Sequence, residues 1–274
     1  MINHLQDTIK LNNGINMPGF GLGVYKVEPG KSTIETVRTA LNTGYRLIDT
    51  AAFYDNEREV GEAIRSSDIP REEIFVTSKV WNDDQGFEST QKAFNKTMEK
   101  LGLEYLDLYL IHWPVSGKFK DTWRALEKIY QEGKVRAIGV STFHVHHLEE
   151  LLKDAKVKPA VNQIEFHPHL TQKDVLSFCK ENDIQMQAWS PLKKGRVLEL
   201  PVIKEIAEKH GKTAAQIILR WDIQHGVATI PKSTKEIRMK ENAAIFDFEL
   251  DKADMEAIDN LNENARSGSN PDDF

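Results

Sequence analysis

The chain has 274 residues, and its 40% hydrophobic and 28% charged residues are typical of a globular protein. This composition excludes an intrinsically disordered chain and a collagen-like repeat. The 36 Lys and Arg residues stand against 42 Asp and Glu residues, a formal net charge of -6. No overall basic field favours nucleic acid or an anionic membrane, so an anionic ligand needs a local site.

Cysteine content and hydropathy both indicate a reducing compartment. Cys179 is the single cysteine, so a disulfide within the chain is impossible, and we expect a buried thiol on a helix. No segment approaches the roughly 18 consecutive apolar residues of a membrane span, and residues 1–14 lack the apolar stretch of a signal peptide. We therefore expect a cytoplasmic protein that binds neither membrane nor nucleic acid.

The first predicted element is a β-hairpin. Residues 8–11 and 14–18 flank Asn12-Asn13-Gly14, which is a strong turn signal. Such a hairpin could plug the N-terminal end of a barrel formed by the strands that follow.

Eight apolar runs of strand length come next, and each is followed by an amphipathic stretch such as 32–42, 57–65 or 122–131. The runs are nearly continuous in apolar residues, as parallel strands covered on both faces should be. After the last run, 235–245 and 252–261 are predicted helices, and 262–274 is predicted to be a surface loop. The eight runs are 19–24, 45–49, 74–78, 106–112, 135–141, 160–164, 184–189 and 227–230.

This alternation predicts an α/β fold, a single-domain (β/α)8 TIM barrel over residues 1–274 with an N-terminal hairpin plug, an extra C-terminal helix and a tail. Length alone would allow two domains. An open doubly wound sheet has the same alternation but would carry a dinucleotide fingerprint. That fingerprint is missing, because Val24 stands where its last glycine should be, and Ile206 likewise interrupts a P-loop.

Titratable residues end four of the predicted strands, at the rim where barrel enzymes carry their chemistry. They are Asp49, Lys79, His112 and Glu165, and Tyr54 follows Asp49 by five residues in the same loop. An Asp, a Lys, a His and a Tyr on one rim predict a proton-transfer site.

Tyrosine ionises near pKa 10 and is too weak an acid unless a cation assists it. We expect Lys79 to favour the phenolate of Tyr54 and so to lower its pKa, while Asp49 keeps Lys79 charged and aimed. His112 would orient and polarise a carbonyl group. Each residue taken alone also has an ordinary structural interpretation. The Asp could cap a turn, the Lys could be exposed to solvent, and the hydrogen bonds of the His could be made within the fold.

These residues stand in segments that resemble the aldo-keto reductase family, whose catalytic tetrad is Asp, Tyr, Lys and His in this order. The tetrad segments are 49–54 (DTAAFY), 78–79 (SK) and 111–114 (IHWP). Further similar segments cover nearly the whole chain: 139–141 (GVS), 162–165 (NQIE) with 167–168 (HP), 189–192 (WSPL), and 230–233 (IPKS) with Arg238, Glu241 and Asn242.

The resemblance implies a barrel that binds NADPH across its C-terminal rim and transfers hydride to a carbonyl group without a metal. Tyr54 is then the general acid, assisted by Asp49, Lys79 and His112. By the same resemblance, the other cofactor contacts fall into three groups: Ser141 and Gln163 at the carboxamide; Trp189 stacked on nicotinamide; and Ser190 with Leu192 at the diphosphate.

The phosphate end of the cofactor has its own implied residues. Lys232, Ser233 and Arg238 would grip the 2′-phosphate of the adenosine, and Glu241 and Asn242 would approach the adenine. A dianionic phosphate needs local cations in a chain of negative net charge, which favours NADP over NAD.

Two places depart from the family pattern. Thr142 follows Ser141 where the family more often has Asn, which puts one carboxamide contact in doubt because Thr offers only a hydroxyl. Lys193 and Lys194 begin a short basic loop where larger relatives carry a longer cofactor-covering segment. One of these lysines could reach the diphosphate, or the pair could be solvated.

Aromatic residues follow three of the strands, where the family lines its substrate pocket. They are Tyr25, Trp81 and Trp113, and they could equally belong to the core. An aromatic wall suits small aldehydes, and the chain most resembles bacterial members that reduce glyoxal, methylglyoxal and diketo sugars.

A histidine-rich segment raises the question of a metal. On a helix, His144 and His147 would share a face while His146 points elsewhere, so at most two imidazoles would converge and we expect no metal site. His167, at the end of the sixth strand, is expected to be structural.

The sequence therefore predicts an NADPH-dependent reductase of small aldehydes and ketones, expected to be a monomer because no heptad or long apolar stripe indicates a partner. The alternative from another class is an NADPH-binding regulatory or sensing subunit with little turnover. A phosphate-binding isomerase on the same barrel has only the fold in its favour.

Overall fold

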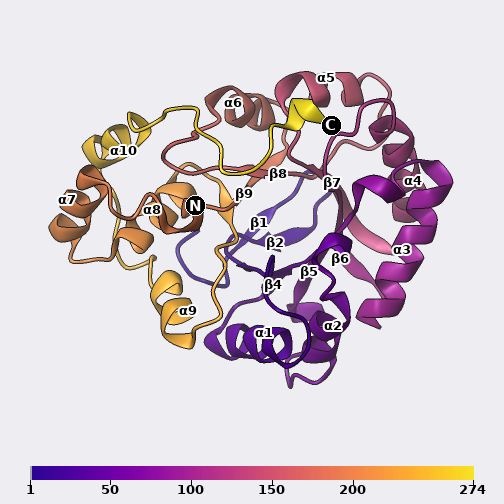
Figure 1. Ribbon diagram of the computed structural model, residues 1–274, viewed down its shortest axis with the longest axis horizontal. Helices are drawn as coiled ribbons and strands as arrows, with labels where there is room; N and C mark the ends of the chain where they lie inside the picture. Colours follow the sequence, from indigo (N-terminus) through magenta and orange to yellow (C-terminus); the bar gives the residue numbers. More distant parts are fainter. Residues whose placement is uncertain (1) are drawn as a thin grey trace.

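The eight apolar runs form one parallel sheet in the computed structural model, which describes residues 2–274 (Figure 1). Neighbouring strands follow the order of the chain. The barrel closes where Phe20 bridges Thr229 and the Gly21 N–H donates to the Thr229 carbonyl at 2.9 Å. The predicted (β/α)8 barrel is confirmed. Its strands are β3 (Leu22–Gly23), β4 (Leu47–Asp49), β5 (Phe75–Val80), β6 (Leu106–Ile111), β7 (Val135–Ser141), β8 (Val161–Glu165), β9 (Gln185–Trp189) and β10 (Ala228–Thr229).

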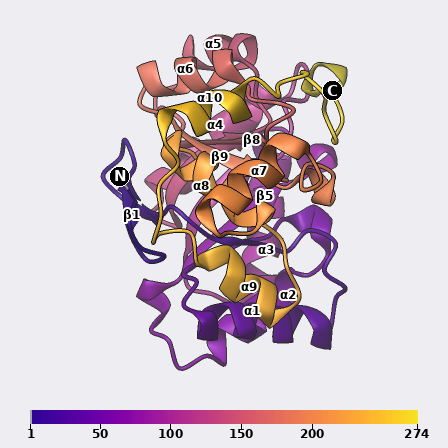
Figure 2. The same cartoon turned by 90° about the vertical axis from the view of Figure 1, so that its left-hand side faces the viewer.

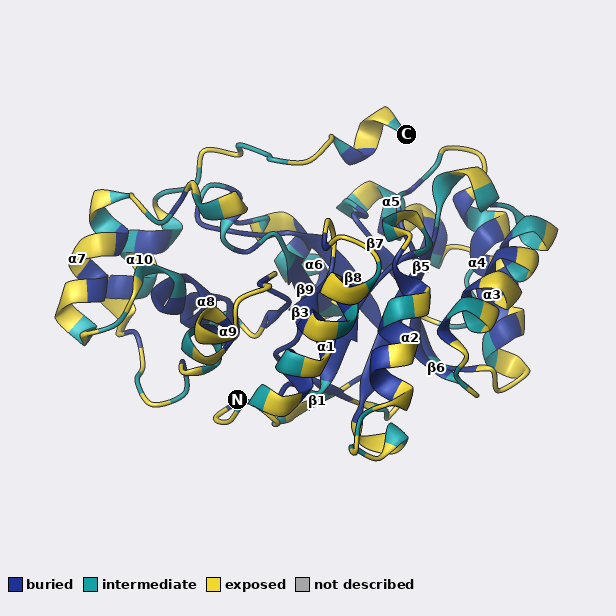
Figure 3. Cartoon of the chain, turned by 60° about the horizontal axis from the view of Figure 1, so that its bottom comes forward, coloured by how far each residue is buried: buried dark blue, intermediate teal, exposed yellow. Residues whose placement is uncertain are grey.

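Helices surround the strands and bury one face each against them. Figure 3 shows the strands almost entirely buried and the helices exposed only on their outer faces, as an amphipathic pattern requires. The helices are α1 (Lys31–Thr43), α2 (Glu57–Arg65), α3 (Phe87–Leu101), α4 (Phe119–Gln131), α5 (Val145–Leu152), α6 (Lys173–Glu181), α7 (Pro201–His210), α8 (Ala214–Gln224), α9 (Glu236–Ala243) and α10 (Lys252–Asp259). Among the helices of residues 2–274, none is long and apolar enough to cross a membrane.

Local sequence signals explain several helix ends. Thr213 caps α8 and Asp251 caps α10, each through its side chain and the backbone three residues on. Gly44 ends α1 in the left-handed region, with a φ of 103°. Gly61 lets α2 approach α3, because a Cβ there would lie 1.9 Å from the Leu101 carbonyl oxygen.

The predicted hairpin plugs the N-terminal end of the barrel. Strands β1 (Thr8–Lys10) and β2 (Asn16–Pro18) pair antiparallel. Leu11 and Met17 pack inside the barrel against Leu47 and other inward side chains. Figure 2 shows the hairpin at one side of the barrel and the C-terminus at the opposite side.

The C-terminal tail crosses the barrel from α10 toward α5 (Figures 1 and 3). It is irregular, as predicted, except for the turn η5 (Pro271–Asp273). The expectation of a mere surface loop is incomplete, because residues 267–269 and Phe274 border the central cavity described next.

Candidate active site

A cavity of about 1320 Å³ opens at the C-terminal ends of the strands. Every tetrad, cofactor and substrate-pocket residue implied by the resemblance borders it except Lys79, which is fully buried and hydrogen-bonded to two residues that do. The expected residues at the cavity are Tyr25, Asp49, Tyr54, Trp81, His112, Trp113, Ser141, Gln163, Trp189, Ser190, Leu192, Lys232, Ser233, Arg238, Glu241 and Asn242.

Strand register brings the Asp, Lys and Tyr together. Strand β4 pairs with β5 so that Asp49 lies opposite Thr77, and Lys79 follows two residues further along β5. The turn η1 (Ala52–Tyr54) then returns Tyr54 toward the end of β4. The Thr50 hydroxyl donates to Asn56 at 2.7 Å, which ties the two ends of this loop together.

Lys79 uses its three ammonium protons on three oxygens. Its Nζ donates to Asp49 Oδ1 at 2.6 Å, to the Thr50 carbonyl at 2.9 Å and to Tyr54 Oη at 3.3 Å. The second Asp49 oxygen accepts from Gln163 Nε2 at 2.7 Å. A fully buried ammonium held by three oxygens is fixed in position, as a group that acts on a neighbouring phenol must be.

Burial favours the neutral forms of Asp49 and Lys79, whereas their pairing favours the charged forms. Burial raises the pKa of Asp49 and lowers the pKa of Lys79, while their mutual attraction acts in the other direction on each. The short ion pair therefore carries a desolvation cost that an exposed pair would not have.

The pKa of Tyr54 is raised overall, whereas a lowering was expected from the nearby Lys79 charge. Burial and then the Asp49 carboxylate raise the pKa of Tyr54 well above its usual value. The phenol consequently keeps its proton at neutral pH, which suits a proton donor. The lysine charge is visible in the sequence, but the depth of burial is not.

His112 follows β6 directly and faces Tyr54 edge-on, with ring centroids 5.7 Å apart. Burial and then the Lys79 charge lower the pKa of His112 well below its usual value. Its ring is therefore neutral and carries a single N–H. Its Nδ1 is buried without a partner among residues 2–274.

The residues expected near the nicotinamide lie at the ends of the strands that follow β6 along the rim. Gln163 donates to Gln187 Oε1 at 2.8 Å as well as to Asp49. Thr142 holds a φ of 65°, a left-handed conformation that Asn tolerates better than a β-branched residue. Its hydroxyl donates to the His112 carbonyl at 3.3 Å. Thr142 thus supports the rim beside His112 in place of the more usual Asn.

Aromatic rings form the wall of the cavity beside Tyr54. Tyr25 lies 4.9 Å from Tyr54 between centroids. Phe53 stacks on Trp81 at 3.8 Å, and Phe274 stacks on Trp113 at 4.4 Å. Neither phenylalanine was among the pocket residues expected from the sequence. Phe53 precedes Tyr54, and Phe274 is the only aromatic residue after residue 261, so each had a recognisable signal.

The far end of the cavity is open and cationic. Lys232 and Arg238 are exposed, and Lys232 Nζ donates to the Lys26 carbonyl at 2.7 Å. Ser233 and Asn242 are buried at the same end. A phosphate in this place would meet solvated cations and a hydroxyl.

The two lysines of the basic loop lie in different environments. Lys193 is buried, and its Nζ contacts His169 Nδ1 at 3.2 Å and the Ala265 carbonyl at 2.9 Å. It is neither solvated nor free to reach a ligand, contrary to the alternatives expected for it. Lys194 is exposed and borders the cavity.

Glu165 has a structural task that the sequence reasoning did not find. This fully buried carboxylate accepts from His167 Nε2 at 3.0 Å, from the Ser267 N–H at 2.6 Å and from the Gly268 N–H at 3.1 Å. Burial alone would raise its pKa, but these hydrogen bonds lower it to about 2. Glu165 therefore fastens the tail across Trp189, where a Cβ at Gly268 would come within 2.5 Å of the indole. The expected structural role of His167 agrees with this contact.

The histidine segment departs from its prediction. His144, His146 and His147 all converge, together with Asp272 of the tail. The helical spacing argument fails because α5 begins at Val145, so that His144 lies in extended backbone and the other two rings lie in the first turn.

The chain belongs to the aldo-keto reductase family. A sequence profile described as the Aldo/keto reductase family matches residues 19–263. The chain is accordingly an oxidoreductase.

Individual relatives share almost its whole length. It is 62% identical over 270 residues to a glyoxal reductase of Bacillus subtilis, with 98% of each chain covered. It is 43% identical over 270 residues to the methylglyoxal reductase DkgA of Salmonella typhimurium, with 97% of each covered. A crystal structure of a Gox0644 mutant in complex with NADPH is similar with a TM-score of 0.93 and 42% identity, covering 97% of this chain and 98% of that one. None of these relatives supports the alternative of a regulatory subunit.

Proposed function

We propose that the protein reduces small aldehydes and ketones to alcohols with NADPH, and that dicarbonyls of the glyoxal and methylglyoxal type and aromatic aldehydes are among its substrates. The observation that carries this proposal is the Asp49–Lys79–Tyr54 chain of contacts, with His112 beside it at the base of an aromatic-walled cavity. The glyoxal and methylglyoxal reductases among the relatives support the substrate class.

The donor set of the cavity fits NADPH. One end offers the Gln163 amide and the Trp189 ring, and the other offers the cations Lys232 and Arg238 with the Ser233 hydroxyl. An amide, an aromatic face and two cations match a carboxamide, a planar ring and a 2′-phosphate. When bound, NADPH supplies the hydride.

The residues of this chain handle the proton. The neutral His112 N–H donates to the carbonyl oxygen and orients it. Tyr54, which keeps its proton because it is buried, transfers that proton to the same oxygen as negative charge develops there. The Lys79 ammonium, 3.3 Å from the phenolic oxygen, stabilises the phenolate that remains. Asp49 holds Lys79 in place.

The test is oxidation of NADPH by the purified protein with glyoxal, methylglyoxal, a nitrobenzaldehyde, a sugar aldehyde or no substrate, repeated with NADH. We expect turnover that requires an aldehyde and is faster with NADPH. Tight NADPH binding without turnover on any carbonyl would contradict a reductase and favour a sensing subunit. Equal turnover with NADH would contradict the role of Lys232, Ser233 and Arg238.

We further propose a cytoplasmic monomer. The buried free thiol of Cys179 fits a reducing compartment. Light scattering on the purified protein should give a mass near 31.3 kDa.

A further inference from the structure

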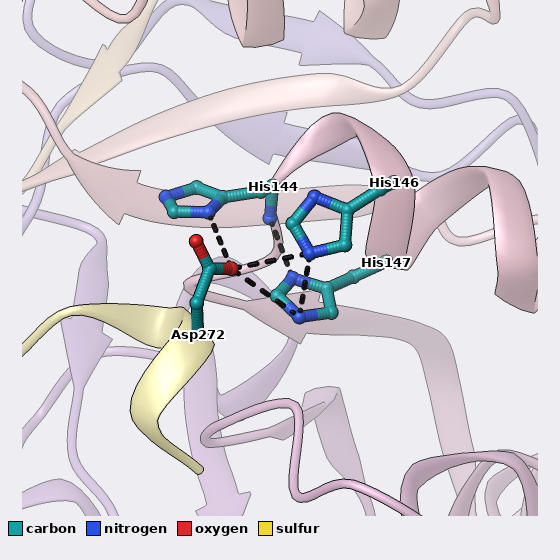
Figure 4. A group of neighbouring side chains, drawn as sticks. All are labelled: His144, His146, His147 and Asp272. Carbon is teal, nitrogen blue, oxygen red and sulfur yellow. Dashed lines mark hydrogen bonds and ion pairs between the residues drawn. The ribbon is translucent and has the colours of Figure 1, made fainter.

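Three imidazoles at the start of α5 and one carboxylate of the C-terminal tail meet at one place (Figure 4). Asp272 Oδ1 lies 2.9 Å from His144 Nδ1, 3.1 Å from His146 Nε2 and 3.6 Å from His147 Nε2. The His146 and His147 Nε2 atoms are 3.1 Å apart. One atom from each of the four residues lies within 4.8 Å of the others.

Four of the six separations between these atoms are close to those of a small tetrahedral site, and all six are within 4.8 Å. Four ligand atoms at about 2.0–2.1 Å from Zn²⁺ stand ~3.3 Å from one another. The separations of Asp272 from the three rings and of His146 from His147, from 2.9 to 3.6 Å, lie on both sides of that value. Imidazole nitrogens and a carboxylate oxygen are also the ligand types that Zn²⁺ and its neighbours in the first transition row prefer.

Access and charge also favour a cation. The His146 side chain is 60% exposed and that of Asp272 is 44% exposed, while His144 and His147 are largely buried. An ion can therefore enter from solvent onto a pair of fixed rings. The carboxylate supplies one negative charge, and neutral imidazoles supply lone pairs once their present hydrogen bonds are exchanged.

We propose that His144, His146, His147 and Asp272 bind one divalent transition-metal ion of the Zn²⁺ type, and that this ion fastens the C-terminal tail to α5. The site is separate from the tetrad and does not depend on the proposed reaction. It joins two segments more than a hundred residues apart in the sequence.

Binding requires two hydrogen bonds to be exchanged. The His144 backbone N–H donates to His147 Nδ1 at 3.2 Å, so that ring carries its proton on Nε2. Arg266 contacts His144 Nε2 at 2.7 Å, which leaves the proton on Nδ1 facing Asp272. When the metal binds, each ring proton moves to the other nitrogen, the His144 N–H loses its acceptor, and Arg266 turns toward solvent. No proton is lost from a neutral ring.

Metal binding at Asp272 also restrains the C-terminal tail. Asp272 stands two residues before Phe274, whose ring stacks on Trp113 at the cavity. The Ser116 N–H also donates to the Phe274 carbonyl at 3.2 Å. A metal that holds Asp272 therefore also restrains Phe274 in its stack on Trp113 at the cavity.

The first experiment titrates Zn²⁺ into tag-free, chelator-treated protein by calorimetry and records the visible absorption bands of the Co²⁺ form. We expect one equivalent bound and a tetrahedral Co²⁺ spectrum. His146→Gln and Asp272→Asn, two partly exposed changes, should each weaken Zn²⁺ binding by about tenfold or more. His4→Gln and Glu149→Gln, an exposed histidine elsewhere and an exposed acid on α5, are matched controls that should bind as the unchanged protein does.

Two results would overturn the site. One is no stoichiometric binding by the unchanged protein, in which case the four residues form a hydrogen-bonded clasp only. The other is binding that the His146 and Asp272 variants retain in full.

The second experiment measures release of Phe274 and Asp273 by a serine carboxypeptidase, which needs no metal of its own. Zn²⁺ should slow the release from the unchanged protein and leave the rate for Asp272→Asn unaltered. Equal rates with and without Zn²⁺ in the unchanged protein would contradict the fastening of the tail.

Discussion

The two ends of the long cavity hold their charges in opposite ways. At the end beneath the aromatic wall, Lys79 and Asp49 are fully buried and each charged atom has a partner within 3 Å. At the other end, Lys232 and Arg238 are exposed, and neither forms an ion pair with another of residues 2–274. One end is built into the barrel strands, and the other lies on the loop and helix that follow β10.

This difference separates two physical tasks. A group that assists proton transfer must be fixed before the substrate arrives, so its desolvation is compensated during folding. A group that recognises a dianionic phosphate can remain hydrated, because Coulomb attraction and hydrogen bonds form only when the ligand binds. Substitutions at the buried end should therefore affect kcat and the free energy of unfolding, whereas substitutions at the exposed end should affect NADPH affinity.

The largest effect is expected from Lys79→Met. It removes the charge proposed to stabilise the phenolate and leaves the buried Asp49 carboxylate without its charged partner. We expect kcat to fall by ~10²-fold or more, and the free energy of unfolding to fall by about 3–5 kcal/mol. Urea unfolding and steady-state kinetics measure both.

Lys240→Met is the matched control for that change, because Lys240 pairs with Glu236 on the exposed face of α9. Its effect on unfolding should stay within about 0.5 kcal/mol. A Lys79 variant as stable as this control would contradict the claim that the buried Lys79–Asp49 pair is needed for stability.

Arg238→Ala tests the open end. It should weaken NADPH binding by about tenfold, leave NADH binding unchanged and leave the free energy of unfolding nearly unchanged. The NADPH affinity of the unchanged protein should also fall with added salt more steeply than that of the variant. Fluorescence titration with both cofactors at two salt concentrations gives the answer, and equal losses for NADPH and NADH would remove Arg238 from the phosphate site.

The pH profile distinguishes Lys79 from Tyr54. Burial lowers the pKa of Lys79, so its charge is lost at a lower pH than that of an ordinary lysine, whereas the pKa of Tyr54 is raised. We expect kcat/KM to decline on the alkaline side below pH 10.5, the ordinary lysine value. Asp49→Asn removes the attraction that raises the lysine pKa, and should move this decline to still lower pH. A decline that does not move would assign it to another group.

The smallest effect is expected between the two ends, at Thr142→Asn. Asn adopts the left-handed backbone at a φ of 65° with less strain than Thr, so the free energy of unfolding should rise by up to about 1 kcal/mol. Thermal unfolding measures this gain. A loss instead would show that the Thr142 hydroxyl bond to the His112 carbonyl outweighs the strain.

Much of the fold and of the site was predictable because it depends on local order along the chain. Apolar runs defined the strands, and residues that end parallel strands meet at one rim, so Asp49, Lys79 and His112 could be grouped before any coordinates. The hairpin plug followed from a turn signal.

What could not be predicted depends on long-range contacts and burial depth. The tail has no periodicity, and its path is set by Glu165, about a hundred residues earlier in the chain. The raised pKa of Tyr54 reflects burial that no sequence pattern measures. Predicting that His146 lies beside His144 and His147 would have required knowing that α5 begins at Val145.

Tyr54→Phe, assayed for NADPH binding and methylglyoxal turnover in the same preparation, tests the central claim most directly. The change removes one hydroxyl that contacts Lys79 and is proposed to protonate the carbonyl oxygen. We predict that turnover falls by ~10²-fold or more while NADPH affinity changes by less than about twofold. Turnover that survives the substitution, or turnover and NADPH binding lost together, would contradict Tyr54 as the proton donor.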